Sequence, residues 1–399
     1  MKKMLRTAGV LLLAFVLLIC AACGGKETPG DQKNGSKAES VKPTDPKDSE
    51  KSGTESAESK GSAEPASSAG DGYEWPVDPE YTYETNGPDV IALRNMLATS
   101  PVVEIPLSVD GKKVNGLYQF AIRNGEHVDE VIIPEGIETM IDSGFSSCDN
   151  LKKITIPASV TQIADSATNP NKDDEFWFDL AHVEDVVITK GNPVYERDGG
   201  IIYRKNKDGS RTIVWYCRSN PEESYTVPDD IGVGAAAFAY TDHLKTLNTP
   251  VFPQSLIGSG IEVINYAPHD SGYIKIDIDP DDTALREVNI RGAFNSDLYS
   301  GTGLQNATRL ERVTMVENKE SISIDGVIYS LNDTGEPSAL TLYPPARKGE
   351  TYEVPDTVTK IGPGAFSGDE LPYLKTLSLK RGCSTDKAKI RKLTVIYRD

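Results

Sequence analysis

The chain has 399 residues, of which 60 are acidic and 42 are Lys or Arg, so its formal net charge is −18 at pH 7. A protein that binds nucleic acid needs a basic face to meet the phosphates, and this charge balance argues against such a partner. Only three of the five cysteines lie beyond residue 72. This odd, scattered set is not a disulfide framework, so stability must come from packing.

The amino-terminal residues have the pattern of an export signal. Positive charges at Lys2, Lys3 and Arg6 precede an uncharged, mostly apolar run over residues 7–22. This run is too short to span a bilayer comfortably, which is typical of the apolar region of a signal peptide. Residues 1–22 are therefore predicted to be removed on export.

The sequence CAACG, residues 20–24, resembles the lipobox of bacterial lipoproteins, in which a small residue precedes a cysteine that becomes acylated. Cys23 fits this role because Ala22 would stand at the cleavage position, although Cys20 occupies a place where leucine is usual. The resemblance implies a lipoprotein signal peptide over residues 1–22 and membrane attachment through an acyl anchor at Cys23. An ordinary secretory signal with a chance cysteine is the alternative.

Residues 23–72 are predicted to be a lipid-anchored, disordered linker. Lys, Glu, Ser, Gly, Pro and Asp dominate this stretch from Gly24 onward, Val41 is its one branched apolar residue, and it has no aromatic residue. Such a composition cannot bury enough apolar surface to offset the entropy of ordering the chain. As a flexible coil the linker would reach roughly 35–40 Å, enough to lift a folded domain away from a membrane.

Residues 73–127 are predicted to form an N-terminal cap. Four aromatic residues stand at its beginning: Tyr73, Trp75, Tyr81 and Tyr83. Exposed aromatic side chains can stack on sugars or anchor protein partners, and buried ones can close the end of a repeat array. Both interpretations remain open for Trp75.

From residue 128 the chain repeats itself every 23 residues. Six apolar or proline positions recur at this spacing: Val128/Leu151, Val131/Ile154, Ile133/Ile156, Pro134/Pro157, Ile137/Val160 and Met140/Ile163. Apolar residues alternate over Val131–Ile133, as a short strand with one buried face requires, and Pro134 then ends the strand. Each unit leaves an apolar edge that only a neighbouring unit can cover, which predicts stacked coils with a parallel sheet.

A longer repeat of about 127 residues lies over the short one. The sequence GGIIY from Gly199 is echoed by DGVIY from Asp325, and YTVP from Tyr225 is echoed by YEVP from Tyr352. Apolar runs flank KNKDGS, residues 205–210, and NDTGEP, residues 332–337, in the manner of β-hairpins with glycine-containing turns. Two coils are therefore predicted to carry an inserted hairpin.

These motifs resemble the BspA-like leucine-rich repeats of bacterial surface proteins. The resemblance rests on Val131 through Leu151, on Tyr352 through Phe366 with its VPDTVTKIGPGAF, and on NPVYERDGGIIY from Asn192. It implies a β-rich repeat solenoid over residues 128–399, with a parallel stacked sheet and inserted β-hairpins. Weaker coils are expected at residues 183–190, 244–250, 285–294 and 310–316. In the coil that begins at Leu151, Ala164 stands where Gly is usual and Thr168 where Phe is usual. We therefore expect this coil to close differently from the others.

Four phenylalanines that follow Gly or Ala should fill the interior of the coils: Phe145, Phe238, Phe294 and Phe366. The small residue lets the backbone close over the ring. Residues Leu393 to Tyr397 should form a strand that closes the array.

We find no pattern of catalytic or metal-binding residues. The four histidines form no zinc-type pair, no nucleophile elbow occurs, and the glycine-rich run from Gly232 falls on a turn of the repeat, so no enzyme activity, metal site or cofactor is predicted. The acidic run Asp277–Asp282 begins like a calcium loop, but position six is Asp282 instead of Gly and position twelve is Val288 instead of Glu. A solvated acidic turn is the favoured interpretation, and calcium binding stays open.

The candidate ligand-binding residues are aromatic. Phe176, Trp177 and Phe178 lie in an insertion between coils, where insertions usually emerge on one face, and with Trp75 they could border a ligand surface. A capping role is the alternative.

The sequence therefore predicts an extracytoplasmic, lipid-anchored protein of the bacterial cell surface. Its repeats would form a binding module for an extracellular protein or glycan, and the family resemblance implies adhesion for some members. The alternative is a structural scaffold of the envelope that binds cell wall or sister proteins.

Overall fold

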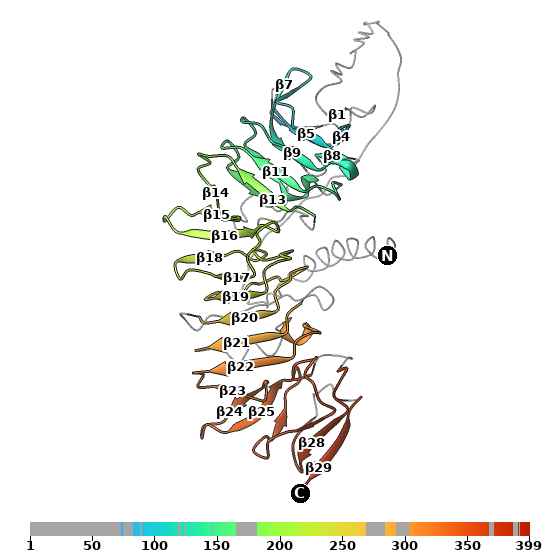
Figure 1. Ribbon diagram of the computed structural model, residues 1–399, viewed down its shortest axis with the longest axis vertical. Coiled ribbons are helices and arrows are strands. Elements are labelled where there is room, and N and C mark those ends of the chain that lie inside the picture. Colours follow the sequence, from blue (N-terminus) through green and yellow to red (C-terminus); the bar gives the residue numbers. More distant parts are fainter. Residues whose placement is uncertain are drawn as a thin grey trace, which may run out of the picture. The chain divides into compact units, whose positions relative to one another are not determined.

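The protein is described by a computed structural model (Figure 1), and all the described residues belong to one compact unit, Pro65–Asp399. They are residues 73–74, 83–87, 90–118, 121–123, 125–145, 147–164, 182–268, 284–292, 303–366, 371–385, 390 and 392–399. Within these residues, no helix is long and apolar enough to cross a membrane. The described helices are short 3-10 turns: η2 (Gly125–His127), η3 (Asp142–Phe145) and η5 (Gly303–Asn306).

The 23-residue spacing sets the register of a parallel sheet. Its four strands are β5 (Val102–Glu104), β9 (Glu130–Ile132), β11 (Lys153–Ile156) and β13 (Asp185–Ile188), which lie side by side in Figure 1. Val131 pairs with Ile154, and Ile154 pairs with Val186. The amide of Ile133 donates to the carbonyl oxygen of Thr155 at 3.0 Å, which brings Ile133 and Ile156 onto neighbouring coils. The predicted stacking is confirmed.

A second set of strands runs along the other half of the same coils. β7 (Lys112–Leu117), β10 (Thr139–Ile141) and β12 (Gln162–Ala164) pair in parallel, and Met140 is opposite Ile163. Beyond β7 this sheet continues through β3 (Val90–Leu93) to β2 (Tyr83–Gly87), and β6 (Ser108–Val109) pairs with β7. A separate small sheet contains β1 (Tyr73–Glu74), β4 (Met96–Ala98) and β8 (Ile122–Arg123). Parallel stacking thus extends to the N-terminal side of residue 128.

Each predicted hairpin is confirmed, and each has a third strand that we did not predict. The first insert consists of β14 (Tyr195–Asp198), β15 (Ile201–Lys205) and β16 (Arg211–Tyr216), all antiparallel. The second consists of β23 (Ser321–Ile324), β24 (Val327–Leu331) and β25 (Pro337–Leu342). The last strand of each insert returns to the stack, because β16 pairs in parallel with β18 (Ile231–Val233) and β25 with β27 (Lys360–Ile361).

An asparagine fixes the start of each insert. Asn192 is buried, and its amide donates to the carbonyl oxygens of Pro157 and Val160 at 2.9 and 2.8 Å. Its Oδ1 accepts from the amides of Val194 and Tyr195, which holds the first turn of the insert. Asn318, which begins the second insert 126 residues later, accepts in the same way from the amides of residues 320 and 321.

The sheet between the two inserts has five parallel strands. They are β17 (Ser224–Thr226), β19 (Thr246–Thr249), β20 (Val263–Tyr266), β21 (Glu287–Arg291) and β22 (Arg312–Val316). The coils expected near residues 244, 285 and 310 are present here, and β13 is the strand of the coil expected from residue 183. The coil that contains β20 was not predicted, because the residues that flank β20 in the sequence do not match the repeat motif.

The C-terminal sheet contains β26 (Thr351–Glu353), β28 (Thr376–Lys380) and β29 (Thr394–Arg398). β29 pairs in parallel with β28 from Thr394 to Arg398, so the predicted closing strand is confirmed one residue further along.

Phenylalanines fill the coil interiors as expected. Phe145, Phe238 and Phe366 are buried, and Phe294 lies outside the described residues. Phe238 packs on Tyr216 of the first insert, and Phe366 packs on Tyr343 just after the second. Each insert thus shares a core with the coil that follows it.

Candidate functional site

The five-stranded sheet has one face in the core and one face outside. Residues at alternate positions of its strands are buried: Leu247, Ile264, Val288 and Val313. Because successive side chains of a strand point to opposite faces, the residues next to these four lie on the outer face. The outer face of β17, β19, β20, β21 and β22 is therefore a continuous surface made by five coils.

A row of amide and hydroxyl side chains crosses this outer face. We name it the amide ladder, and its rungs are Thr226, Asn248, Asn265, Asn289 and Thr314. Nδ2 of Asn248 donates to Oγ1 of Thr226 at 2.9 Å. Nδ2 of Asn265 donates to Oδ1 of Asn248 at 2.7 Å, and Nδ2 of Asn289 donates to Oδ1 of Asn265 at 2.9 Å.

The ladder keeps hydrogen-bonding capacity on its outer side. A primary amide has two N–H donors and an oxygen with two lone pairs. Asn248 and Asn265 each give one donor to the neighbouring rung, and these residues are half-exposed. Asn289 uses both donors, because it also donates to Oε1 of Glu287 at 3.0 Å. The threonine hydroxyls at the two ends can each donate as well as accept.

Glu287 orients this end of the ladder. Burial disfavours the charged form of its carboxyl, but hydrogen bonds from Arg312 and Asn289 and the charge of Arg312 outweigh burial and lower the pKa of Glu287. The carboxylate thus stays ionised at neutral pH and accepts from both neighbours.

A groove of about 490 Å³ follows the ladder at the ends of the strands. Two aliphatic side chains in its lining are accessible, Pro250 and Val316, and a third, Ile290, is only 2% exposed. Val316 is 43% exposed, so its side chain is accessible to a ligand. The groove therefore combines a hydrogen-bonding floor with an aliphatic wall.

Three ion pairs join neighbouring coils of this sheet. Arg312 pairs with Glu287, Arg286 pairs with Glu262 at 3.6 Å, and Arg291 pairs with Glu317 at 3.2 Å. The groove lining also includes the exposed carboxylate of Asp229.

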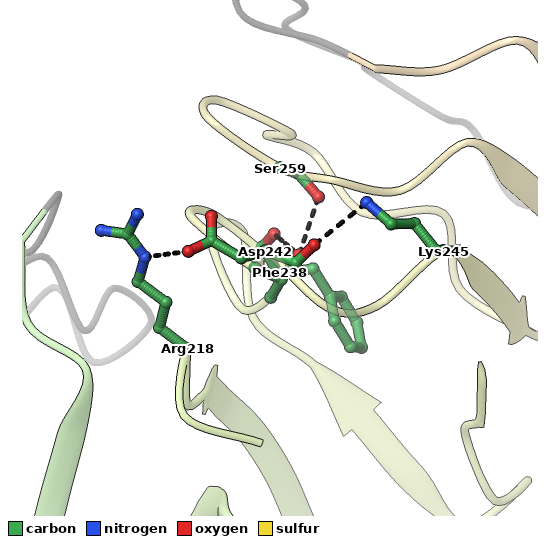
Figure 2. Close-up of polar contacts among 6 residues, drawn as sticks. Arg218, Phe238, Asp242, Lys245 and Ser259 are labelled. Atoms are coloured by element: carbon green, nitrogen blue, oxygen red, sulfur yellow. Dashed lines mark hydrogen bonds and ion pairs between the residues drawn. The ribbon is translucent and has the colours of Figure 1, made fainter. Parts of the chain in front are cut away.

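A second hollow, of about 410 Å³, lies at the loops that precede the strands. It is lined by polar residues from four coils: Asp149, Asn150, Lys152, His182, Glu184, Arg218, Ser219, Asp242 and His243. Figure 2 shows Arg218 and Asp242 from this hollow with their neighbours: Nε of Arg218 contacts Oδ2 of Asp242 at 2.5 Å, and Nζ of Lys245 donates to the Asp242 backbone oxygen at 3.0 Å. Ser259, also in Figure 2, contacts the Thr241 hydroxyl at 2.9 Å.

The polar hollow does not combine its groups into a reactive set. In the described part of the chain, no hydrogen bond joins His182 or His243 to Ser219 or to a carboxylate, and no group of three or more His, Cys, Asp or Glu is arranged to hold a metal ion. Two of its basic side chains instead pair with a neighbouring coil, Arg218 with Asp242 and Lys152 with Asp129. General acid–base or nucleophilic chemistry requires groups within hydrogen-bond reach of one another.

Three histidines occupy one position of the coil. His127, His182 and His243 are exposed, and each directly precedes a buried aliphatic residue. His243 therefore lies on an exposed turn, as expected. The glycine-rich run begins within β18, at Gly232, and only its later part, from Ala235, lies on the turn after that strand.

The binding and lipidation residues proposed from the sequence lie outside the described residues. They are Cys23, Trp75, Phe176, Trp177 and Phe178, together with the acidic run Asp277–Asp282. The amide ladder was missed by sequence reasoning. In the sequence, the ladder is marked by an asparagine at the third position of each of three strands, TLNT, VINY and EVNIR. This pattern can be seen only when VINY is recognised as the strand of a coil.

Comparison with known proteins identifies the repeats. Residues 104–172 match the family described as BspA type Leucine rich repeat region, in six copies. No curated protein matches the chain.

Solved structures of bacterial leucine-rich repeat proteins are similar to this chain. A leucine rich cell surface protein from Faecalibacterium prausnitzii A2-165 is 13% identical, with 81% of this chain and 72% of that one covered and a TM-score of 0.30. A leucine-rich repeat protein from Bacteroides ovatus is 16% identical, with 82% and 67% covered and a TM-score of 0.31. The pneumococcal vaccine antigen PcpA is 12% identical, with 82% and 99% covered and a TM-score of 0.27.

Proposed function

We propose that this chain, whose residues 104–172 are a BspA type leucine-rich repeat region, is a binding module of the bacterial cell surface that captures an extracellular protein or glycan. The observation that carries the proposal is the groove beside the amide ladder, where five coils supply one surface. Repeat arrays bind through such extended surfaces, because each coil adds a few side chains to a common face.

The chemistry of the groove favours recognition over reaction. Its floor offers amide and hydroxyl donors and acceptors, and its wall offers aliphatic contact. A few placed polar groups within an apolar lining fix the orientation of a ligand and provide specificity. The broad, open form of the sheet face suits a polymer ligand better than a small molecule.

Attachment to the membrane is part of the proposal. Acylation of Cys23 would hold the chain at the membrane, and residues 23–72 would act as the tether. In a native bacterial host, the wild-type chain should partition into the detergent phase, and Cys23→Ala should partition into the aqueous phase. Equal partitioning of the wild-type chain and Cys23→Ala would show that Cys23 does not anchor the chain to the membrane.

The aromatic residues Phe176, Trp177, Phe178 and Trp75 remain candidate contacts at the border of the ligand surface. If Trp177→Ala leaves every measured ligand affinity unchanged while the fold is intact, this part of the proposal is wrong.

A binding screen tests the groove. The full chain is presented to extracellular matrix proteins, to neutral and acidic glycans, and to purified cell wall. Two variants are compared with it. Val316→Asp places a charge in the groove. Leu107→Asp is the matched control, because Leu107 is 46% exposed and lies outside the groove lining. Loss of a retained ligand by Val316→Asp but not by Leu107→Asp supports the proposal.

The same screen separates the alternative function. Retention of cell wall or of a second copy of the chain, with no retention of matrix protein or glycan, indicates an envelope scaffold. If no ligand distinguishes Val316→Asp from Leu107→Asp, the groove is not the binding site.

A further inference from the structure

We propose that the groove binds an uncharged, proline-rich segment of a partner protein in the polyproline II conformation, and that the amide ladder holds the carbonyl groups of that segment. This inference rests on the proposed function and names the ligand class for the same groove. It is supported by the spacing of the rungs, by their free donors and by the pairing of the neighbouring arginines with glutamates.

The rung spacing selects the conformation of the ligand. Neighbouring strands of a sheet lie about 4.8 Å apart, so alternate rungs lie about 9.6 Å apart. A polyproline II helix repeats every three residues, or about 9.3 Å, and its backbone groups make no internal hydrogen bonds. In an extended β-strand, the groups on one side recur every two residues, or about 6.7 Å. This distance matches neither the roughly 4.8 Å between neighbouring rungs nor the roughly 9.6 Å between alternate rungs. An α-helix satisfies its own carbonyl groups internally and cannot offer them to the ladder.

Alternate rungs offer donors that match this repeat. Thr226, Asn265 and Thr314 are the first, third and fifth rungs. The Thr226 hydroxyl accepts from Asn248 and keeps its own hydrogen, and Asn265 keeps one amide hydrogen after donating to Asn248. The hydroxyl of Thr314 provides the third donor. Carbonyl groups of residues i, i+3 and i+6 of the ligand would meet these three donors over about 19 Å.

The wall of the groove favours a peptide over a sugar. Proteins bind sugar rings by stacking them on exposed aromatic rings, and the aromatic residue in the groove lining, Tyr266, is only 3% exposed. The accessible aliphatic side chains Pro250 and Val316 instead offer contacts that suit proline rings.

The paired charges of the face favour an uncharged ligand. The arginines beside the ladder, Arg291 and Arg312, are each paired with a glutamate on the same face. An acidic ligand residue would lose hydration there without gaining a free arginine as its partner. A proline-rich segment also loses little conformational entropy on binding, because its conformation is already restricted.

The test measures binding of fluorescent peptides to the full chain by polarisation. The probes are a nine-residue peptide of Ala-Pro-Pro repeats, a nine-residue Gly/Ser peptide as the flexible control, and a neutral β-linked glucose oligomer. The Ala-Pro-Pro peptide should bind at least about tenfold more tightly than the flexible peptide.

Matched variants locate the contact. Thr314→Val removes a hydroxyl from the ladder and should weaken binding of the Ala-Pro-Pro peptide about 5- to 10-fold, the effect of one hydrogen bond. Thr246→Val makes the same change on the outer face of β19, outside the groove lining, and should leave the affinity unchanged. Circular dichroism checks that both variants fold.

The outcomes separate this inference from the proposed function. If the full chain binds no Ala-Pro-Pro peptide, or if Thr246→Val and Thr314→Val weaken binding equally, the inference is overturned. In that case, Val316→Asp can still abolish retention of another ligand, such as the glucose oligomer, and the proposed function then stands. If no ligand responds to Val316→Asp, the proposed function fails as well.

Discussion

The hydroxyl oxygens of Tyr329 and Tyr352 lie 2.5 Å apart in the C-terminal core, where Tyr329 belongs to the second insert and Tyr352 to the next coil. The first insert has the equivalent pair, since the hydroxyls of Tyr203 and Tyr225 lie 3.2 Å apart. An arginine also stacks on each pair, with Arg347 at 4.6 Å from the Tyr352 ring and Arg211 at 4.7 Å from the Tyr203 ring. Each pair joins an antiparallel insert to the parallel stack.

The Tyr329 variant tests this junction. Tyr329→Phe leaves the Tyr352 hydroxyl buried without its partner, so the free energy of unfolding should fall by about 1–3 kcal/mol. Urea denaturation measures the change. A double-mutant cycle with Tyr352→Phe should recover part of the loss, because both hydroxyls are then absent. Additive losses in the double variant would mean that the two hydroxyls do not interact.

The Phe366 variant tests the filling of the coil interior. Phe366 is buried against Tyr343, so Phe366→Ala should lower the free energy of unfolding by ~3–5 kcal/mol through lost burial and a cavity. Tyr397→Ala serves as the control, since Tyr397 is an aromatic residue that is 49% exposed on β29. Thermal melting should separate the two variants clearly. An unchanged melting temperature for Phe366→Ala would show that the ring does not fill the core.

The contact between Gly125 and Cys148 tests the stacking of neighbouring coils. These residues are 23 positions apart and occupy the same place in successive coils. A Cβ atom on Gly125 would lie 2.4 Å from Sγ of Cys148, so Gly125→Ala should destabilise the chain by about 1–3 kcal/mol through overpacking. Adding Cys148→Ala removes the sulfur and should restore part of the stability. If the second change brings no recovery, the clash is with another neighbour of Gly125.

The pH dependence of stability should reveal the buried thiol of Cys148. Burial, with a smaller effect of Asp149, raises the pKa of Cys148 from 9.0 to about 12. The folded state therefore holds this proton more tightly than the unfolded state, and the stabilisation is fully present below pH 9. It should be lost as the pH rises from 9 towards 12. Denaturation midpoints across this window should fall less steeply for Cys148→Ala than for the wild-type chain.

Thiol accessibility gives an independent check on the same residue. Cys148, Cys217 and Cys383 are buried and free, and burial raises the pKa of Cys217 to about 11. A thiol-reactive dye should label Cys148 and Cys217 slowly in native buffer and rapidly in urea, because the thiolate is the reactive form. Rapid labelling of Cys148 in the native chain would contradict its place in the core.

The recurring apolar positions of the sequence determine much of this fold. Parallel strands pair in register when each coil has the same length, so the equal spacing of Val131 and Ile154 predicts their pairing. The turns KNKDGS and NDTGEP predict the hairpins, because glycine and polar residues between apolar runs permit a tight reversal. The longer repeat of about 127 residues, as in GGIIY from Gly199 and DGVIY from Asp325, predicts that these hairpins are inserted within two coils.

Only the tertiary structure places the outward-facing residues. The rungs from Thr226 to Asn289 are separated by 22, 17 and 24 residues, so no fixed period brings them together in the sequence. Burial constrains inward positions to be apolar, whereas outward positions are set by coil length and by the loops between strands. The amide ladder and its groove exist because five coils of unequal length still align their strands, and that alignment is a property of the packed sheet.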